Sequence, residues 1–105
     1  MKVISEIIEF PISIDGVDTY EKEVKVLYTS LTRIQSKEAA TIEVTGKLDD
    51  DMEYTSIQGF SDATLSKVTN ITDTTVCSFD TDGYYKIKLK QTDEKPNKII
   101  VVGCR

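Results

Sequence analysis

Residues 84–91 read YYKIKLKQ, and polar and apolar side chains alternate along this stretch at every second position. Tyr85, Ile87 and Leu89 fall on one side, with lysines between and after them. A period of two is typical of a β-strand with one face in the core and the other in water. The stretch therefore predicts a strand whose Tyr85, Ile87 and Leu89 point inward.

The N-terminal segment repeats this alternation, with four residues expected on its inward face: Ile8, Phe10, Ile12 and Ile14. Pro11 has no N–H for a sheet ladder, so this strand should lie at an edge or break there. Asp15-Gly16 supplies the positive φ angles of a tight turn. We therefore predict a first hairpin that returns along residues 20–28, where Tyr20, Val24, Val26 and Tyr28 alternate with Glu21, Glu23, Lys25 and Leu27.

The middle of the chain carries weaker signals. Residues 31–34 favour a continuing strand over a short helix beginning near Ser30, because serine and threonine are poor helix formers. Residues 41–45 predict another strand, ended by Gly46. The charged run at 47–53 predicts a solvated loop. Residues 61–68 fit either one or two helical turns or an extended segment.

The last third of the chain predicts two further strands, one before residues 84–91 and one after them. Residues 71–79 form one strand, and Asp80–Gly83 form a hairpin turn that leads back into residues 84–91. Residues 99–102 are apolar at every position. We therefore expect this strand in the interior of a sheet with both faces covered.

The composition agrees with an all-β chain. Val, Ile and Thr together number 34 of the 105 residues, whereas Leu and Ala number only eight. Branching at Cβ suits a pleated, half-buried surface and disfavours a helical bundle. We expect one domain over residues 1–105, a β-sandwich or small barrel of six to eight mostly antiparallel strands.

Composition also disfavours several functional classes. The chain has no histidine, so it lacks the commonest general base and metal ligand. Its net charge of −5 opposes binding to a phosphate backbone. No apolar run approaches the roughly 20 residues that span a bilayer, and the first residues lack the apolar core of a signal peptide. We therefore expect a chain made in the cytoplasm, with neither nucleic acid nor membrane as a partner, whose Cys77 and Cys104 are separate reduced thiols.

No catalytic arrangement is evident in the sequence. The eight serines have no histidine to activate them, and nucleophile-elbow, dinucleotide and phosphate-loop motifs are missing. A run of carboxylates at 49–53 lacks the spacing of an EF-hand calcium loop, so a solvated loop explains it better. We expect a protein that is not an enzyme and has no cofactor.

A basic stripe is the candidate interaction site. Lys86, Lys88 and Lys90 occupy the outward positions of the predicted strand, and Tyr84 precedes them. Residues 1–79 carry seven basic and 14 acidic residues, whereas residues 80–105 carry six and four. This split predicts contacts between subunits through surfaces of opposite charge.

The same lysines also fit two roles within a single chain. Lysines protect an edge strand against aggregation. They also pair with carboxylates on neighbouring strands, and the candidates here are Glu21, Glu23 and Glu43.

In its general character the chain is similar to small accessory proteins of virions, which are short, β-rich and without catalytic motifs. That resemblance implies a non-enzymatic structural or interaction module of a larger assembly, such as a phage capsid, tail or fibre. Its partners would be protein subunits of the same or a neighbouring kind, within an oligomer. The alternatives are a free-standing carbohydrate- or peptide-binding β-sandwich and, less favoured, a small enzyme.

Overall fold

A computed structural model describes all residues from 1 to 105, and its regular structure consists of β-strands. The strands are β1 (Lys2–Phe10), β2 (Ile12–Ile14), β3 (Val17–Thr19), β4 (Glu21–Lys25), β5 (Leu31–Ser36), β6 (Ile42–Lys47), β7 (Thr55–Ser56), β8 (Gly59–Ser61), β9 (Lys67–Val68), β10 (Asn70–Ile71), β11 (Cys77–Asp80), β12 (Lys86–Gln91) and β13 (Asn97–Cys104).

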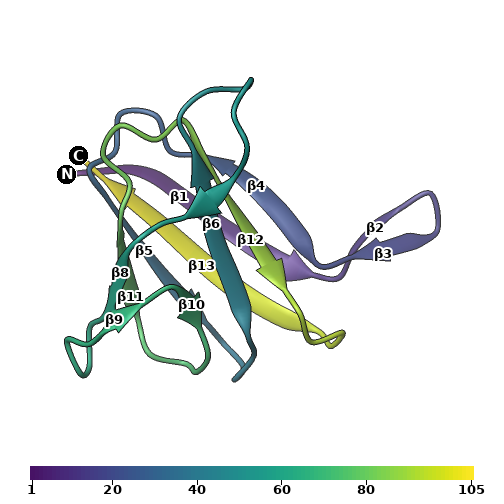
Figure 1. Cartoon of the computed structure of the whole chain (residues 1–105). Helices are drawn as coiled ribbons and strands as arrows, with labels where there is room; N and C mark the ends of the chain where they lie inside the picture. Colours follow the sequence, from purple (N-terminus) through teal and green to yellow (C-terminus); the bar gives the residue numbers. More distant parts are fainter.

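Two antiparallel sheets pack face to face, and a small hairpin projects from one end (Figure 1). The first sheet has the order β1-β13-β5-β11-β8-β9. The second has the order β10-β6-β12-β4, with β7 beside β6. The projecting hairpin consists of β2 and β3 and is called the arm (residues 12–19). The two chain ends lie together, where the Arg105 amide donates to the Met1 carbonyl at 2.8 Å.

The inner faces of the two sheets share one core of 15 buried residues. The first sheet contributes Phe79, Ile99 and Val101, and the second contributes Ile87 and Leu89, all of them fully buried. Burying such side chains stabilises a fold by about 1.5–3 kcal/mol each. The predicted all-β fold is confirmed, and a core enclosed by two sheets makes it a β-sandwich.

The chain crosses between the sheets after most strands, which corrects two local predictions. Asp80–Gly83 do form a turn, in which the Tyr84 amide donates to the Thr81 carbonyl at 3.0 Å. The turn is not a hairpin, because it leads from β11 in the first sheet to β12 in the second. Residues 71–79 are likewise not one strand, since β10 and β11 belong to different sheets.

Three buried threonines connect the crossing from β4 to β5 with the crossing from β11 to β12. The Thr29 hydroxyl donates to the Val26 carbonyl at 2.6 Å, and its oxygen lies 2.6 Å from that of Thr81. Thr81 lies 3.0 Å from Thr32. Since each hydroxyl has one proton, the Thr29 bond to Val26 requires Thr81 to donate to Thr29 and Thr32 to donate to Thr81.

The N-terminal hairpin is shorter than predicted. β1 is an edge strand and ends immediately before Pro11, as the proline indicates. Asp15 and Gly16 make the turn with φ angles of +51° and +79°, but it joins β2 to β3 only. β1 and β4 lie in different sheets. Ile14, expected inward, is 60% exposed because the arm carries it away from the core.

β13 lies between β1 and β5, so its predicted place inside a sheet is confirmed. Its second face is not covered within this chain, since Ile100 is 41% exposed while Val101 is fully buried. One face of the first sheet packs on the second sheet, and the other face is open to water at Ile7 and Ile100. The expectation of two covered faces is therefore wrong for the single chain.

Of the remaining local predictions, some are confirmed and others are wrong. Leu31–Ser36 is a strand and not a helix, as expected, but it does not continue the preceding strand, because β4 and β5 belong to different sheets. Residues 48–53 form an exposed loop, whereas Lys47 is the last residue of β6. Gly46 does not end its strand, because it lies inside β6. Residues 61–68 are extended around a turn. Cys77 and Cys104 are separate thiols, on β11 and β13 to either side of β5.

Candidate functional site

The lysine-bearing strand lies inside the second sheet, between β4 and β6. Lys88 is paired across the ladder with Glu23 on β4, and Lys90 with Glu21 on β4 and Glu43 on β6. An interior strand needs no protection as a sheet edge, so the lysines do not have that role. The ladder does place Lys88 and Lys90 beside the carboxylates proposed as partners within the chain.

The lysines differ in how far they are engaged. The Lys86 ammonium lies 3.6 Å from Asp50, whose carboxylate also lies 3.6 Å from Lys47. The Lys88 ammonium lies 4.7 Å from the centre of the Tyr54 ring, and the Lys47 ammonium lies 4.9 Å from it. Lys90 is exposed and has no ion pair within 4 Å.

Glu23 and Tyr54 are a hydrogen-bonded pair on this face, and the pKa values of both side chains are shifted. The Tyr54 hydroxyl donates to the Glu23 carboxylate, and this bond, aided by the nearby ammonium groups, lowers the pKa of Glu23. Partial burial, and next the contact with Glu23, raise the pKa of Tyr54 above its ordinary value. Glu23 is therefore an ionised acceptor and Tyr54 a neutral donor at neutral pH.

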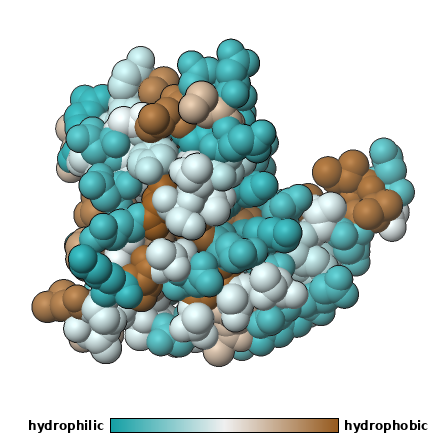
Figure 2. All heavy atoms as spheres, in the orientation of Figure 1, coloured by the Kyte–Doolittle hydropathy of each residue, from teal (hydrophilic) through white to brown (hydrophobic).

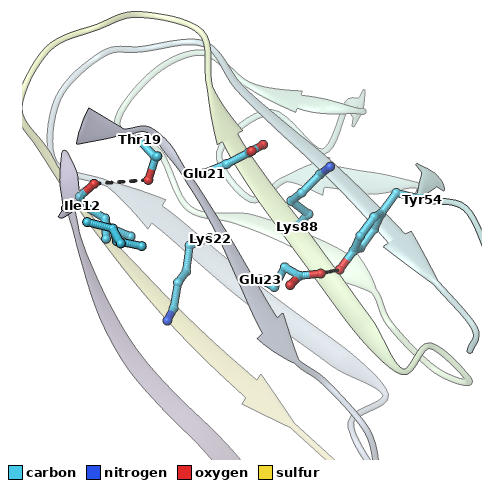
Figure 3. A pocket seen from close by; sticks show the side chains of 8 residues that line it. Ile12, Thr19, Glu21, Lys22, Glu23, Tyr54 and Lys88 are labelled. Atoms are coloured by element: carbon cyan, nitrogen blue, oxygen red, sulfur yellow. Dashed lines mark hydrogen bonds between the residues drawn. The ribbon is translucent and has the colours of Figure 1, made fainter. Parts of the chain in front are cut away.

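Glu23 and Tyr54 line an open hollow of about 480 Å³ between the arm and the second sheet (Figure 3). The arm contributes Ile12, Ile14 and Thr19, and the Thr19 hydroxyl donates to the Ile12 carbonyl at 3.2 Å. The sheet contributes the charged groups of Glu21, Lys22, Glu23 and Lys88. The hollow thus presents groups of both signs, although Lys22 is directed toward Glu6 on β1, 3.9 Å away.

Tyr84 does not join the lysine stripe. Its ring packs against the core, and a Cβ added to Gly46 would lie 2.8 Å from the ring atom Cδ1. Tyr85 takes the outer position instead, with the Lys86 ammonium 5.2 Å from its ring centre. Adjacent residues point to opposite faces, as alternation requires, but the assignment of Tyr85 to the inward face is wrong.

Two apolar surfaces are not identified from the sequence as contact sites. One is the tip of the arm, where Ile14 and Val17 are 60% and 63% exposed. Figure 2 shows hydrophobic atoms gathered near the end of this projection. The other is the outer face of the first sheet, where Ile7 is 63% exposed and is the ladder partner of Ile100.

A usable signal for both surfaces exists in the sequence. Neighbouring residues of a strand face opposite sides, so Ile7-Ile8 and Ile99-Ile100 must each place one isoleucine on the outer face. Ile14 and Val17 flank a two-residue turn, so they stand at the end of a hairpin. Residues so placed reach the core only when the hairpin lies flat on it.

Residue types that commonly bind metal ions do not cluster in this fold. No group of three or more cysteine, aspartate or glutamate side chains is placed to hold a metal ion. The acidic loop at 49–53 directs Asp50 toward Lys47 and Lys86. No helix of the chain has the length and apolarity needed to cross a membrane.

No protein-family model and no curated protein matches this sequence. Among solved structures, the fold is similar to that of the SPBc2 prophage-derived protein YomS. The TM-score is 0.71, and the match covers 96% of this chain and 95% of the other. The two chains share a fold. Their sequence identity is 13%, so the likeness extends to the architecture of the whole domain and not to individual side chains.

Proposed function

We propose that this chain is a non-enzymatic structural subunit of a phage particle, which acts by binding neighbouring protein subunits. The observation that carries the proposal is the arm. Its β2–β3 ladder has three residue pairs and projects from the sandwich, with Ile14 and Val17 exposed at its end. An isolated two-stranded hairpin is marginally stable in water, so a projecting apolar arm is typical of an element that a partner covers.

Two further observations support this function. The similar fold of YomS belongs to a prophage-derived protein. The outer face of the first sheet also presents Ile7 and Ile100, which are cross-strand partners. Apolar groups gathered on an otherwise charged surface are the usual mark of a protein contact.

The proposal that the chain is not an enzyme takes account of Glu23 and Tyr54, whose pKa values are shifted. Shifted pKa values are found at catalytic sites, but ion-pair networks also produce them. Glu23 and Tyr54 are hydrogen-bonded to each other in an open hollow, and lysines surround them. This arrangement favours a role in binding or stability for both groups.

A free-standing carbohydrate-binding module fits these surfaces less well. Sugar recognition commonly uses an aromatic ring with an open face. Tyr54 is the aromatic residue of the hollow, and two ammonium groups lie within 5 Å of its ring centre. The contacts that hold Tyr54 in place compete with stacking of a sugar.

The lysine stripe is retained in the proposal as a second contact surface that sets partner choice. Lys90 is its available member, because Lys86 and Lys88 are engaged within the chain. Exposed charge pairs contribute about 0–1 kcal/mol each, so apolar contacts at the arm supply most of the affinity.

The experiment is to induce phage production in a host that encodes the chain and to separate particles from soluble protein on a density gradient. A structural subunit co-sediments with the particles and remains bound after washing in about 0.5 M salt, which screens adventitious charge contacts. Recovery of the whole pool in the soluble fractions would contradict the proposal.

A further inference from the structure

The tip of the arm combines apolar and acidic groups. Ile14 and Val17 are paired at the last rung of the β2–β3 ladder. Asp15 follows in the turn, and Asp18 accepts a hydrogen bond from the Ser13 hydroxyl at 2.5 Å. Neither aspartate has an ion pair within 4 Å. The tip therefore needs a partner surface that is both apolar and basic.

The outer face of the first sheet holds a hollow with those two properties. It measures about 370 Å³ and is lined by Gln35, Ser36, Lys37, Thr74, Lys98 and Ile100. Lys37 and Lys98 have no ion pair within 4 Å, and no carboxylate lines the hollow. Glu9, the ladder partner of Lys98, and Glu38 line an adjoining hollow, which Lys37 and Lys98 also border.

We propose that the arm of one copy of this chain docks into the hollow at Lys37, Lys98 and Ile100 of a second copy. This inference rests on the proposed function and names the partner of the arm. Apolar Ile14 and Val17 would cover exposed Ile100, and the two aspartates would face the two lysines. Both surfaces lie on every copy and differ from each other, so the contact is head-to-tail.

The opposite signs on the two surfaces favour a second copy over an unrelated partner. The arm tip carries two carboxylates, and the hollow carries two ammonium groups. Juxtaposed like charges would weaken the contact, so this match selects the orientation in which the tip meets the hollow.

Sedimentation velocity on the purified chain, over a range of concentrations and at low salt, tests self-association. The wild type should form species larger than the monomer as the concentration rises. The double variant Ile14→Ser with Val17→Ser should remain a monomer, because both side chains are exposed and the fold does not need them. Leu65→Ser is the matched control, since Leu65 is 78% exposed on another turn and should associate normally.

Charge reversal tests the partner surface independently of the apolar contact. Asp18→Lys leaves one carboxylate and one ammonium group on the arm tip, and Lys37→Glu leaves one of each in the hollow. Each variant therefore loses the net attraction between its own arm and its own hollow. Each variant alone should self-associate about tenfold more weakly than the wild type. An equimolar mixture of the two should recover association as heterodimers, because the unchanged arm of the Lys37→Glu chain meets the unchanged hollow of the Asp18→Lys chain.

A wild type that remains monomeric, a Ser variant that associates normally, or a mixture without recovery would each overturn the inference. Particle binding separates this result from the proposed function. If the chain is a monomer in solution yet is found in purified particles, the second-copy partner is wrong and the structural role stands. If it self-associates but is missing from particles, the proposed function is wrong.

Discussion

Ile14 and Val17 face each other across the last rung of the arm, and each has more than half of its surface in water. They lie beyond the two sheets, so the sandwich does not bury them. The largest core side chains of the same molecule are fully buried. This contrast is the basis of the proposal that the arm binds a partner while the sandwich holds the arm in place.

Replacing Val101 with Asp should reduce the free energy of unfolding by several kcal/mol, measured by urea denaturation. Val101 is fully buried between the sheets, and an unpaired charge there loses its hydration. Ile100→Asp is the control, because Ile100 lies next to Val101 on the exposed face. It should cost less than about 1 kcal/mol. Equal losses for the two variants would contradict the assignment of faces on β13.

Thr81→Val should reduce the free energy of unfolding by about 1–3 kcal/mol, because it leaves two buried hydroxyls without their partner. Thr32 loses the acceptor for its proton, and Thr29 loses the donor to its oxygen. Thr72→Val, at an exposed position outside the strands, should change stability by only a few tenths of a kcal/mol. If the two variants unfold at the same urea concentration, the threonine contacts do not hold the crossings together.

Tyr54→Phe should raise the pKa of Glu23 toward its ordinary value, since the variant keeps the ring and removes the hydroxyl that donates to the carboxylate. A folded-state pKa below the unfolded value stabilises the fold above the unfolded pKa. This contribution is lost as the pH falls through the lowered pKa, and it should be smaller in the variant. NMR titration of the Glu23 carboxyl carbon measures both midpoints, and identical midpoints would contradict the hydrogen bond.

Lys90→Gln tests the lysine stripe as a contact surface. Lys90 is exposed, and its ladder partners are Glu21 and Glu43. If the stripe sets partner choice, the variant should bind particles a few-fold more weakly, as the loss of one exposed charge pair predicts. Lys67→Gln on β9, also exposed, is the control for net charge. Equal particle binding by the two variants would make Lys90 a solubilising residue only.

Local pattern predicts much of the strand content and little of the strand pairing. Alternation at residues 31–34, 41–45 and 84–91 identifies strands correctly, although the last of them begins only at Lys86, because side-chain polarity reports directly which face is buried. The turn at Asp82-Gly83 has the chemistry of a hairpin, yet it joins two sheets. Turn residues specify local backbone angles, whereas the partner of a strand depends on contacts distant in sequence, such as that of Thr81 with Thr29.

The candidate site is less predictable than the fold. Lys86, Lys88 and Lys90 do lie on the second sheet's outer face, but the sequence does not reveal that Asp50 and Tyr54 engage two of them. Ile12 and Ile14 continue the alternation of the preceding residues, so the pattern assigns the arm to a longer strand. The proline before them marks the interruption, but no local signal shows that the chain leaves the sandwich after it.

The copy number of the chain in purified particles, measured by quantitative mass spectrometry, tests the central claim most directly. The wild type and the Leu65→Ser control should be present in many copies per particle, and the Ile14→Ser, Val17→Ser variant should be lost from them. A wild type that is absent from particles, or an arm variant retained at the full copy number, would contradict the account of this chain as a structural subunit held by its arm.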